Sequence, residues 1–173
     1  HVFGALLVEV DKDGDWFVRQ LIADSASGEF YDLDTLYTPE GYMEGQTVEA
    51  INYGDIHAEK EDDIVSDVSW GYNGYSMLDV LKPKYQFCHD LTDFESRNHH
   101  TISDPYFRFA SHMHTQDTVL SNMMQVVRTL TDMDRDYCTT VIVESNHDLA
   151  LQKWLKNSDY KSDPANALFF LEC

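Results

Sequence analysis

The chain has 173 residues, of which 43% are hydrophobic, and this suffices for one domain with a hydrophobic core. Its 31 acidic and 12 basic residues give a formal net charge of −19, which excludes a basic groove that would hold a nucleic-acid backbone directly. Cys88, Cys138 and Cys173 show no C-x-x-C spacing. We therefore expect neither a disulfide framework nor a thiolate zinc site, and a reducing, cytoplasmic setting. No apolar run approaches the roughly 18 residues of a membrane span, so we expect none.

Residues 2–23 predict a β-hairpin. Branched and aromatic residues precede and follow a cluster of aspartates around Gly14, which is the order strand, tight turn, strand. The aspartates also resemble the start of a helix–loop–helix calcium loop, but Ile22 stands where that loop needs a bidentate glutamate. Residues 11–63 are strongly acidic, and we expect them to form a solvated acidic face.

Three later segments share one pattern, in which a short β-rich run ends in Asp, Asn or His side chains. They cover residues 48–57, 84–90 and 138–148. Polar clusters at the carboxyl ends of strands are where α/β sheets place their functional sites. Because helical segments are expected between them, the alternation predicts a layered α/β domain whose site-bearing strands run parallel.

The clearest helix is predicted over residues 116–136. Apolar residues recur there at the spacing of one buried helix face, namely at Leu120, Met123, Met124, Val127 and Leu130. A shorter helix is expected near residues 76–81, because Pro83 would end it.

The last part of the chain predicts a further helix and then a strand. The helix should begin just after His147 and turn three apolar residues inward, namely Leu151, Trp154 and Leu155. Residues 168–171, Leu-Phe-Phe-Leu, have the apolar character of a buried strand cut off within a domain. We therefore expect the chain to be a truncated core.

Side chains of metal-binding type end the three β-rich segments, namely Asp55, His57, Asp90, Asn146 and His147. Divalent ions accept such a mixture of oxygen and nitrogen ligands. A carboxylate such as Asp90 can bridge two ions, and the amide oxygen of Asn146 can complete a shell without adding charge. Two ions about 4 Å apart would activate a water molecule and neutralise a phosphoryl oxygen. They would also supply the positive field that an acidic chain lacks.

The order of these residues resembles the calcineurin-like metallophosphoesterases, whose motifs are D-x-H, G-D-x-x-D and G-N-H-[DE]. The matching residues are Asp55 and His57, then Asp90 and Asp93, then Asn146, His147 and Asp148. His89 and Ser145 replace the glycines of the second and third motifs. The resemblance implies a layered β-sandwich flanked by helices, as a single partial catalytic domain over residues 1–173 with its motif-bearing core at about 48–156.

The resemblance also implies two divalent metal ions. Asp55 and His57 would hold the first ion. Asp90 would bridge the two, and Asn146 would bind the second. Manganese is the preferred metal for this set of oxygen and nitrogen ligands, with magnesium, iron or zinc as alternatives.

His147 would be the catalytic histidine by the same resemblance, with Asp148 orienting its ring. It would protonate the leaving oxygen or stabilise the transition state, because an imidazole generally titrates near neutral pH and is a suitable acid. Asp93 would brace its loop. The family carries a further His and a final G-H-x-H, whereas no histidine follows His147 here. We therefore expect the fragment alone to be weakly active or inactive.

Two further histidine-containing segments lie between the second and third motifs. Arg97, His99 and His100 follow Asp90 closely, so they could return over the site and touch a substrate phosphate, or form a solvated loop. The pair in residues 112–114 resembles the closing H-x-H, but it precedes the third motif and lacks the leading glycine. Phe94 stands where phosphoprotein phosphatases carry arginine, which argues against phosphoprotein substrates.

More narrowly, residues 89–100 and the Ser-Asn-His-Asp of 145–148 look like the pre-early DNA-transfer proteins of T-five-like phages. Those proteins are longer and are associated with host DNA degradation and the entry of phage DNA. The resemblance implies a manganese-dependent DNase in the host cytoplasm, with DNA held through the metals or another domain.

Two alternatives stay open. The first is a small-nucleotide phosphoesterase, which a pocket closed by aromatic residues such as Tyr53, Trp70 or Tyr72 would support, whereas an open groove would support DNA. The second is a non-catalytic binding or assembly module that keeps a partial metal site, since an acidic surface suits protein partners or a homo-oligomer. Residues 70–75 would then be either an interaction loop or a glycine-rich turn.

Overall fold

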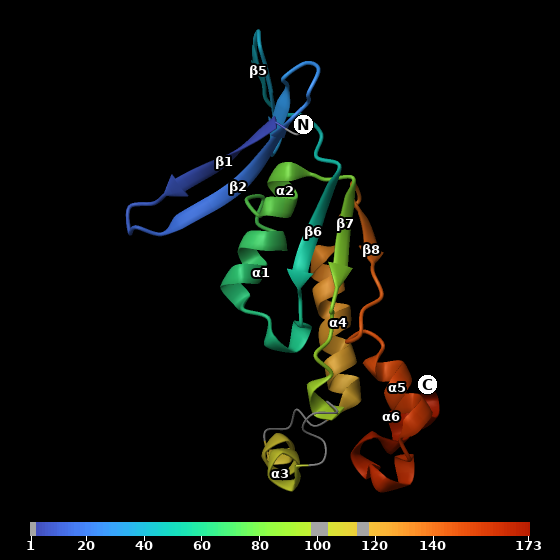
Figure 1. The fold of residues 1–173 in the computed structure, drawn as a ribbon. Helices are drawn as coiled ribbons and strands as arrows, with labels where there is room; N and C mark the ends of the chain where they lie inside the picture. The colour runs from blue at the N-terminus through green and yellow to red at the C-terminus, as the bar shows by residue number, and fades with distance from the viewer. Residues whose placement is uncertain (1–2, 98–103, 114–117) are drawn as a thin grey trace. The chain divides into compact units, whose positions relative to one another are not determined.

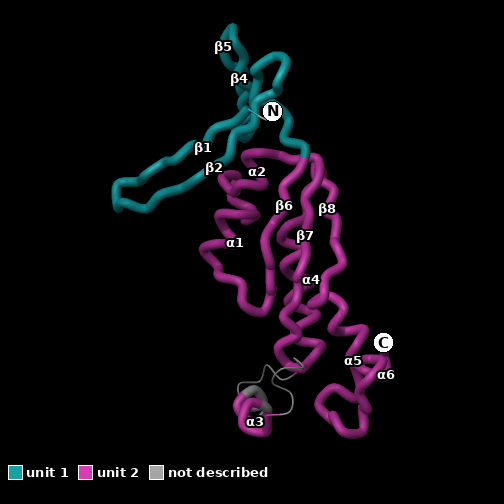
Figure 2. The backbone as a smooth tube through the Cα atoms, in the orientation of Figure 1, with its two compact units in different colours: residues 1–49 teal, residues 50–173 magenta. Residues whose placement is uncertain are grey.

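The computed structural model describes residues 3–97, 104–113 and 118–173, although the side chains of residues 108, 111 and 112 are not described (Figure 1). The chain divides into two compact units, unit 1 at residues 1–49 and unit 2 at residues 50–173 (Figure 2). The expectation of a single catalytic domain over the whole chain stays a prediction. All three motifs lie in unit 2.

Unit 1 begins with the predicted hairpin. Strands β1 (Phe3–Val10) and β2 (Trp16–Ala23) pair antiparallel along their whole length. In the turn, the Asp11 carboxylate accepts the backbone N–H groups of Asp13 and Asp15 at 2.9 and 3.0 Å, and Gly14 has a φ of 89° that favours glycine. The aspartate cluster therefore shapes the turn, and the hairpin prediction is confirmed.

A second sheet follows in unit 1, within the stretch that we expected only as an acidic face. Its strands are β3 (Phe30–Asp32), β4 (Thr35–Thr38) and β5 (Gly41–Met43), paired antiparallel in that order. The Phe30 and Tyr37 rings stack at 4.9 Å across the first pair. These strands have only three or four residues each, too few to show a clear alternating pattern, which is why the sequence did not reveal them.

Among the described residues, unit 2 contains a parallel sheet of three strands in the order β6 (Ala50–Asp55), β7 (Tyr85–His89) and β8 (Thr139–Ile142). The register pairs Asp55 with His89 and Cys88 with Ile142. Parallel strands present their carboxyl ends at the same edge, so the predicted mixed α/β class and parallel arrangement are confirmed.

Three helices pack with this sheet around a common core (Figure 1). They are α1 (Asp63–Trp70), α2 (Met77–Leu81) and α4 (Val119–Met133). The buried core residues are Tyr53, Trp70, Leu78, Cys88, Leu91, Met133 and Cys138. Helix α2 is the short helix expected near residues 76–81, and Ser76 caps it. Helix α1, capped by Asp62, was not predicted.

Helix α4 confirms the predicted long helix, but part of its predicted inward face was wrong. Met123 and Leu130 pack against the two cores. Leu120, Met124 and Val127 are exposed instead, and the buried positions of the helix are Val119, Asn122, Thr129 and Met133. The buried face includes polar residues, which a pattern of apolar residues does not count. The predicted face is therefore rotated about the helix axis relative to the observed one.

The remaining helices are α3 (Pro105–Met113), α5 (Ala150–Asn157) and α6 (Ala167–Glu172). The described residues also contain four 3₁₀ turns, namely η1 (Ala58–Lys60), η2 (Glu95–Arg97), η3 (Tyr160–Ser162) and η4 (Pro164–Asn166). Helix α5 is the one predicted after His147, and it buries Trp154 with Leu151 and Leu155 packed beside it. None of the described helices is long and apolar enough to span a membrane.

The predicted C-terminal strand was wrong, because these residues form α6. The Phe170 ring lies 5.0 Å from the Trp154 ring, and Phe169 packs on the same cluster, while Leu168 and Leu171 are exposed. A run of four apolar residues fits either a strand or one turn of helix, and the contact with α5 favours the helix.

Candidate metal centre

The three motifs meet at the carboxyl edge of the parallel sheet. Asp55 and His89 end neighbouring strands, and the third motif occupies the turn between β8 and α5. The backbone N–H of His57 donates to the Asp90 carbonyl at 2.8 Å, and that of Ala58 to the Leu91 carbonyl at 2.9 Å. These bonds continue the β6–β7 pairing past the strand ends, so the first two motif loops are held together.

Left-handed backbone is concentrated in these loops. Three of the five described non-glycine residues with positive φ lie here, namely His57, Asp90 and Phe94, with φ angles of 46°, 49° and 53°. A non-glycine residue in this region costs on the order of 1–3 kcal/mol, and such strain persists where the surrounding structure enforces it, often at functional sites. The loop geometry therefore marks this edge of the sheet as a candidate site independently of the motif resemblance.

Asp148 ties the third motif to the second. Its carboxylate accepts the backbone N–H groups of Asp90 and Leu91 at 3.0 and 2.8 Å, and the Ser145 hydroxyl donates to it at 2.9 Å. The nearby hydroxyl of Ser145, a residue that replaces a motif glycine, also lowers the pKa of Asp90. This effect and that of His89 outweigh the desolvation of the Asp90 carboxyl. Asp90 is therefore held as a carboxylate, the form that binds metal.

Glu59 fixes the second motif loop from the other side. Its carboxylate accepts the backbone N–H groups of Asp93 and Phe94 at 2.9 and 3.1 Å, together with the Thr92 hydroxyl. Sequence reasoning missed this residue, because one glutamate in an acidic stretch carries no signal of its own. Its position two residues after His57 means that η1 clamps the loop that carries Asp93.

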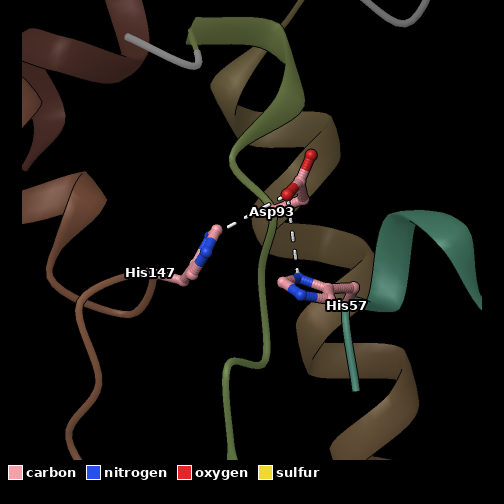
Figure 3. Close-up of side chains that lie close together, drawn as sticks. All are labelled: His57, Asp93 and His147. Atoms are coloured by element: carbon pink, nitrogen blue, oxygen red, sulfur yellow. Dashed lines mark ion pairs between the residues drawn. The ribbon is translucent and has the colours of Figure 1, made fainter. Parts of the chain in front are cut away.

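The first group of candidate ligands is His57, Asp93 and His147 (Figure 3). The Nδ1 atoms of both histidines lie 3.8 Å from Oδ1 of Asp93, and the two rings are 4.9 Å apart, edge to face. Lys60 donates to Oδ2 of the same carboxylate at 2.7 Å. Asp93, expected only as a loop brace, is thus shared by both histidines.

The second group is Asp55, His89 and Asp90. Nδ1 of His89 lies 3.0 Å from Oδ2 of Asp90 and 3.7 Å from Oδ1 of Asp55. In each group, one ligand atom from every member lies within 4.8 Å of the others. The structure thus groups the predicted ligands differently from the motif resemblance, which assigns Asp55 and His57 to the same ion. In the structure His57 lies with His147, and Asp55 lies with Asp90.

In both groups, the separations between histidine nitrogens and carboxylate oxygens fit a divalent ion. Ligand atoms about 2.1 Å from one ion can be up to about 4.2 Å apart, so separations of 3.7 and 3.8 Å are compatible with a shared ion. Nδ1 of His57 and Oδ1 of Asp90 are buried, and within the described part of the chain they have no hydrogen-bond partner. Buried polar atoms normally have one, and a cation would satisfy both.

Other predicted residues do not join these groups. Asn146 is exposed in the turn before α5. Arg97 was expected either to touch a substrate phosphate or to lie in a solvated loop. Its side chain is 4% exposed and its guanidinium bonds to Asp163 through two 2.6 Å contacts, so it lies in a buried ion pair instead. His99 and His100 lie outside the described residues, as does His114.

A cavity adjoins the second group. It has a volume of about 310 Å³ and is lined by Asp55 and Lys60 together with the aromatic residues Tyr53 and Trp70. Tyr72 lines a separate cavity of about 480 Å³ with Trp70 and Arg128. Tyr53 and Trp70 are buried core residues, so the first cavity has a rigid aromatic wall beside a candidate metal ligand.

Comparison with known proteins gives one informative similarity. The chain is 50% identical over 171 residues to a protein of Escherichia phage T5 called Protein A1, and the match covers 96% of this chain and 31% of the phage protein. The chain therefore spans about a third of the length of this relative. No protein-family model and no solved structure matches the chain. The similarity supports a phage protein, in line with the narrower of the two sequence resemblances.

Proposed function

We propose that the chain carries the motif-bearing part of a two-metal phosphodiesterase, and that its substrate is DNA, as for a manganese-dependent nuclease of a phage. The observation that carries the proposal is the convergence of three separate loops at one sheet edge, where they form two groups of carboxylate and imidazole ligands. The layered metallophosphoesterase sandwich is part of the same proposal, with the β6–β7–β8 sheet as one of its layers. The host cytoplasm is the proposed place of action.

Two divalent ions held there would supply an activated water molecule and neutralise charge on the phosphoryl oxygens. Asp90 is the candidate bridging ligand, because its backbone is hydrogen-bonded to His57 of the first motif and to Asp148 of the third, and its carboxyl is held in the charged form. Asn146 remains a proposed ligand, since the turn that carries it belongs to the same edge.

His147 is the proposed general acid, and in this role it is not a ligand of the ion that His57 and Asp93 would hold. Its Nδ1 faces Asp93 and its side chain is partly exposed, so Nε2 is the atom that can present a proton to a leaving oxygen (Figure 3). We assign the orienting role to Asp93, because the Asp148 carboxylate is engaged by the backbone of the second motif loop. Asp148 would then act by placing the loop that carries Asp90.

Lys60 is the proposed cation for the substrate phosphate, in place of Arg97. Its side chain is 56% exposed and lines the cavity beside Asp55. Hydrogen bonding to Asp93 raises the pKa of Lys60, which keeps the amine protonated. The support for DNA is the phage similarity together with Phe94, which removes the arginine expected for phosphoprotein substrates.

The cavity beside Asp55 favours one second candidate, a phosphoesterase for small nucleotides. Its volume of about 310 Å³ is at the lower end of the range of small-molecule pockets, and Tyr53 and Trp70 offer aromatic surface for a base. This candidate shares the metal ligands with the nuclease and differs in the substrate alone.

The test is cleavage of plasmid and linear DNA with Mn²⁺ or with a chelator, using the protein in its longest natural form. We expect cleavage to require Mn²⁺ and to be lost in Asp90→Ala and His147→Ala. It should persist in Lys153→Ala, a control on α5 away from the ligand groups.

Intact DNA with hydrolysis of a small phosphodiester would select the second candidate. If neither substrate is hydrolysed, the enzyme proposal is wrong and a binding or assembly module becomes the better explanation.

A further inference from the structure

We propose that His89 is a metal ligand, and that it forms with Asp55 and Asp90 a divalent-cation site. The motif that this chain resembles has glycine at this position, so the motif itself provides no metal ligand there. The inference deepens the proposed function, on which it rests for the role of Asp55 and Asp90 as ligands.

The strand register places His89 opposite Asp55. These two residues are partners in the parallel β6–β7 pair, and each is the last residue of its strand. Partner residues on neighbouring strands lie about 5 Å apart, so their side chains leave the sheet edge together. Asp90 follows directly, and its φ of 49° turns the carboxylate back to the imidazole, with 3.0 Å between Oδ2 and Nδ1.

Burial gives the site a closed side and an open side. The side chains of His89 and Asp90 are 27% and 13% exposed, whereas that of Asp55 is 64% exposed. An ion between them would have protein ligands on one side and could take water or a substrate oxygen on the other. That is the arrangement of a catalytic site, in which part of the coordination shell stays open.

An unsatisfied atom points independently to a cation. Oδ1 of Asp90 is buried and has no hydrogen-bond partner among the described residues, although the other oxygen of the carboxylate contacts His89. Leaving a buried acceptor unpaired destabilises the fold, and the cost is larger for a charged group. A metal ion bound by Asp90 would remove this cost, and the His89 imidazole, 3.0 Å from the other oxygen of the carboxylate, is the nitrogen ligand of this group.

The first experiment measures Mn²⁺ binding without substrate by isothermal titration calorimetry. His89→Gly restores the motif residue, and we expect it to weaken one class of Mn²⁺ site by about tenfold or more. His89→Gln keeps an N–H donor for Asp90, so it separates a ligand from a hydrogen-bonding role, and it should also weaken binding. Wild-type affinity in either variant would overturn the proposal.

The second experiment does not depend on how those variants fold. In the double variant His57→Ala/His147→Ala, pulsed electron paramagnetic resonance of bound Mn²⁺ should still detect a ¹⁴N coupling, which comes from His89. Absence of the coupling, or of bound Mn²⁺, would contradict the assignment.

The outcome is separable from that of the proposed function. A protein that binds Mn²⁺ through His89 but cleaves no phosphodiester refutes the function alone. A protein that cleaves DNA and binds Mn²⁺ normally as His89→Gly refutes the ligand alone.

Discussion

The Arg97–Asp163 pair provides the sharpest test of how the second motif loop is held. Arg97 lies in η2, just beyond that loop, and its guanidinium makes a bidentate contact with the carboxylate of Asp163. Asp163 also accepts from Asn166 at 3.0 Å, and Asn166 accepts the N–H of Val119, the first residue of α4, at 2.7 Å. One carboxylate therefore connects the loop, the C-terminal segment and the start of the long helix.

We expect Asp163→Ala to destabilise unit 2 strongly, because it leaves a buried guanidinium without its counter-charge. Breaking a buried pair in this way costs about 3–5 kcal/mol. The Asp163 side chain is 12% exposed, so water reaches part of the site and the lower end, about 3 kcal/mol, is expected. For a chain of this size that corresponds to a fall in Tm of about 6–12 °C.

The assay is urea unfolding of the wild type, Asp163→Ala, Arg97→Met and the double variant Arg97→Met/Asp163→Leu. The double variant should recover more than half of the loss, because two apolar side chains of similar volume replace a buried ion pair at little net cost. Suppose instead that Asp163→Ala unfolds within about 0.5 kcal/mol of the wild type, while Arg97→Met raises KM for DNA. Our reasoning would then be refuted, and Arg97 would be the substrate contact that the sequence predicted.

Three further predictions concern the candidate centre. Glu59→Gln should lower the free energy of unfolding in urea by about 1–3 kcal/mol and should weaken Mn²⁺ binding in calorimetry. The reason is that an amide group then faces the backbone N–H donors of the loop that carries Asp93. Unchanged values in both measurements would contradict the role of Glu59 in holding this loop. Lys60→Met should raise KM for DNA by about five- to tenfold with little change in kcat, and Lys60→Arg should restore the KM of the wild type. A change confined to kcat would exclude a phosphate contact. The pKa of Asp90 in the folded state is below its ordinary value, so its contribution to stability is present above about pH 3.9 and is lost as the pH falls through the lowered value. The stability of Ser145→Ala should depend less steeply on pH in this range. Identical profiles by circular dichroism would show that Ser145 does not lower the pKa of Asp90.

Sequence patterns predicted those elements whose formation depends on neighbours along the chain. The hairpin follows from branched residues on both sides of an aspartate turn, and the end of α2 follows from Pro83. The parallel order of β6, β7 and β8 also follows, because strands separated by helical segments cannot pair as hairpins. The rotated face of α4 and the helical state of residues 167–172 could not be predicted in this way, because both depend on which partner packs against them.

The same distinction between sequence and tertiary structure applies to the candidate metal centre. The sequence by itself determined which residues stand at the strand ends, since three short motifs place Asp55, His57, Asp90 and His147 there whatever the packing. Only the tertiary structure decided how they combine: His57 with Asp93 and His147, Asp55 with His89 and Asp90, and Arg97 inside an ion pair instead of at the site. The physical reason is that the chain order of a motif constrains the backbone path alone. Distances between side chains depend on strand register, on left-handed turns and on long-range carboxylate bonds such as those of Glu59 and Asp148.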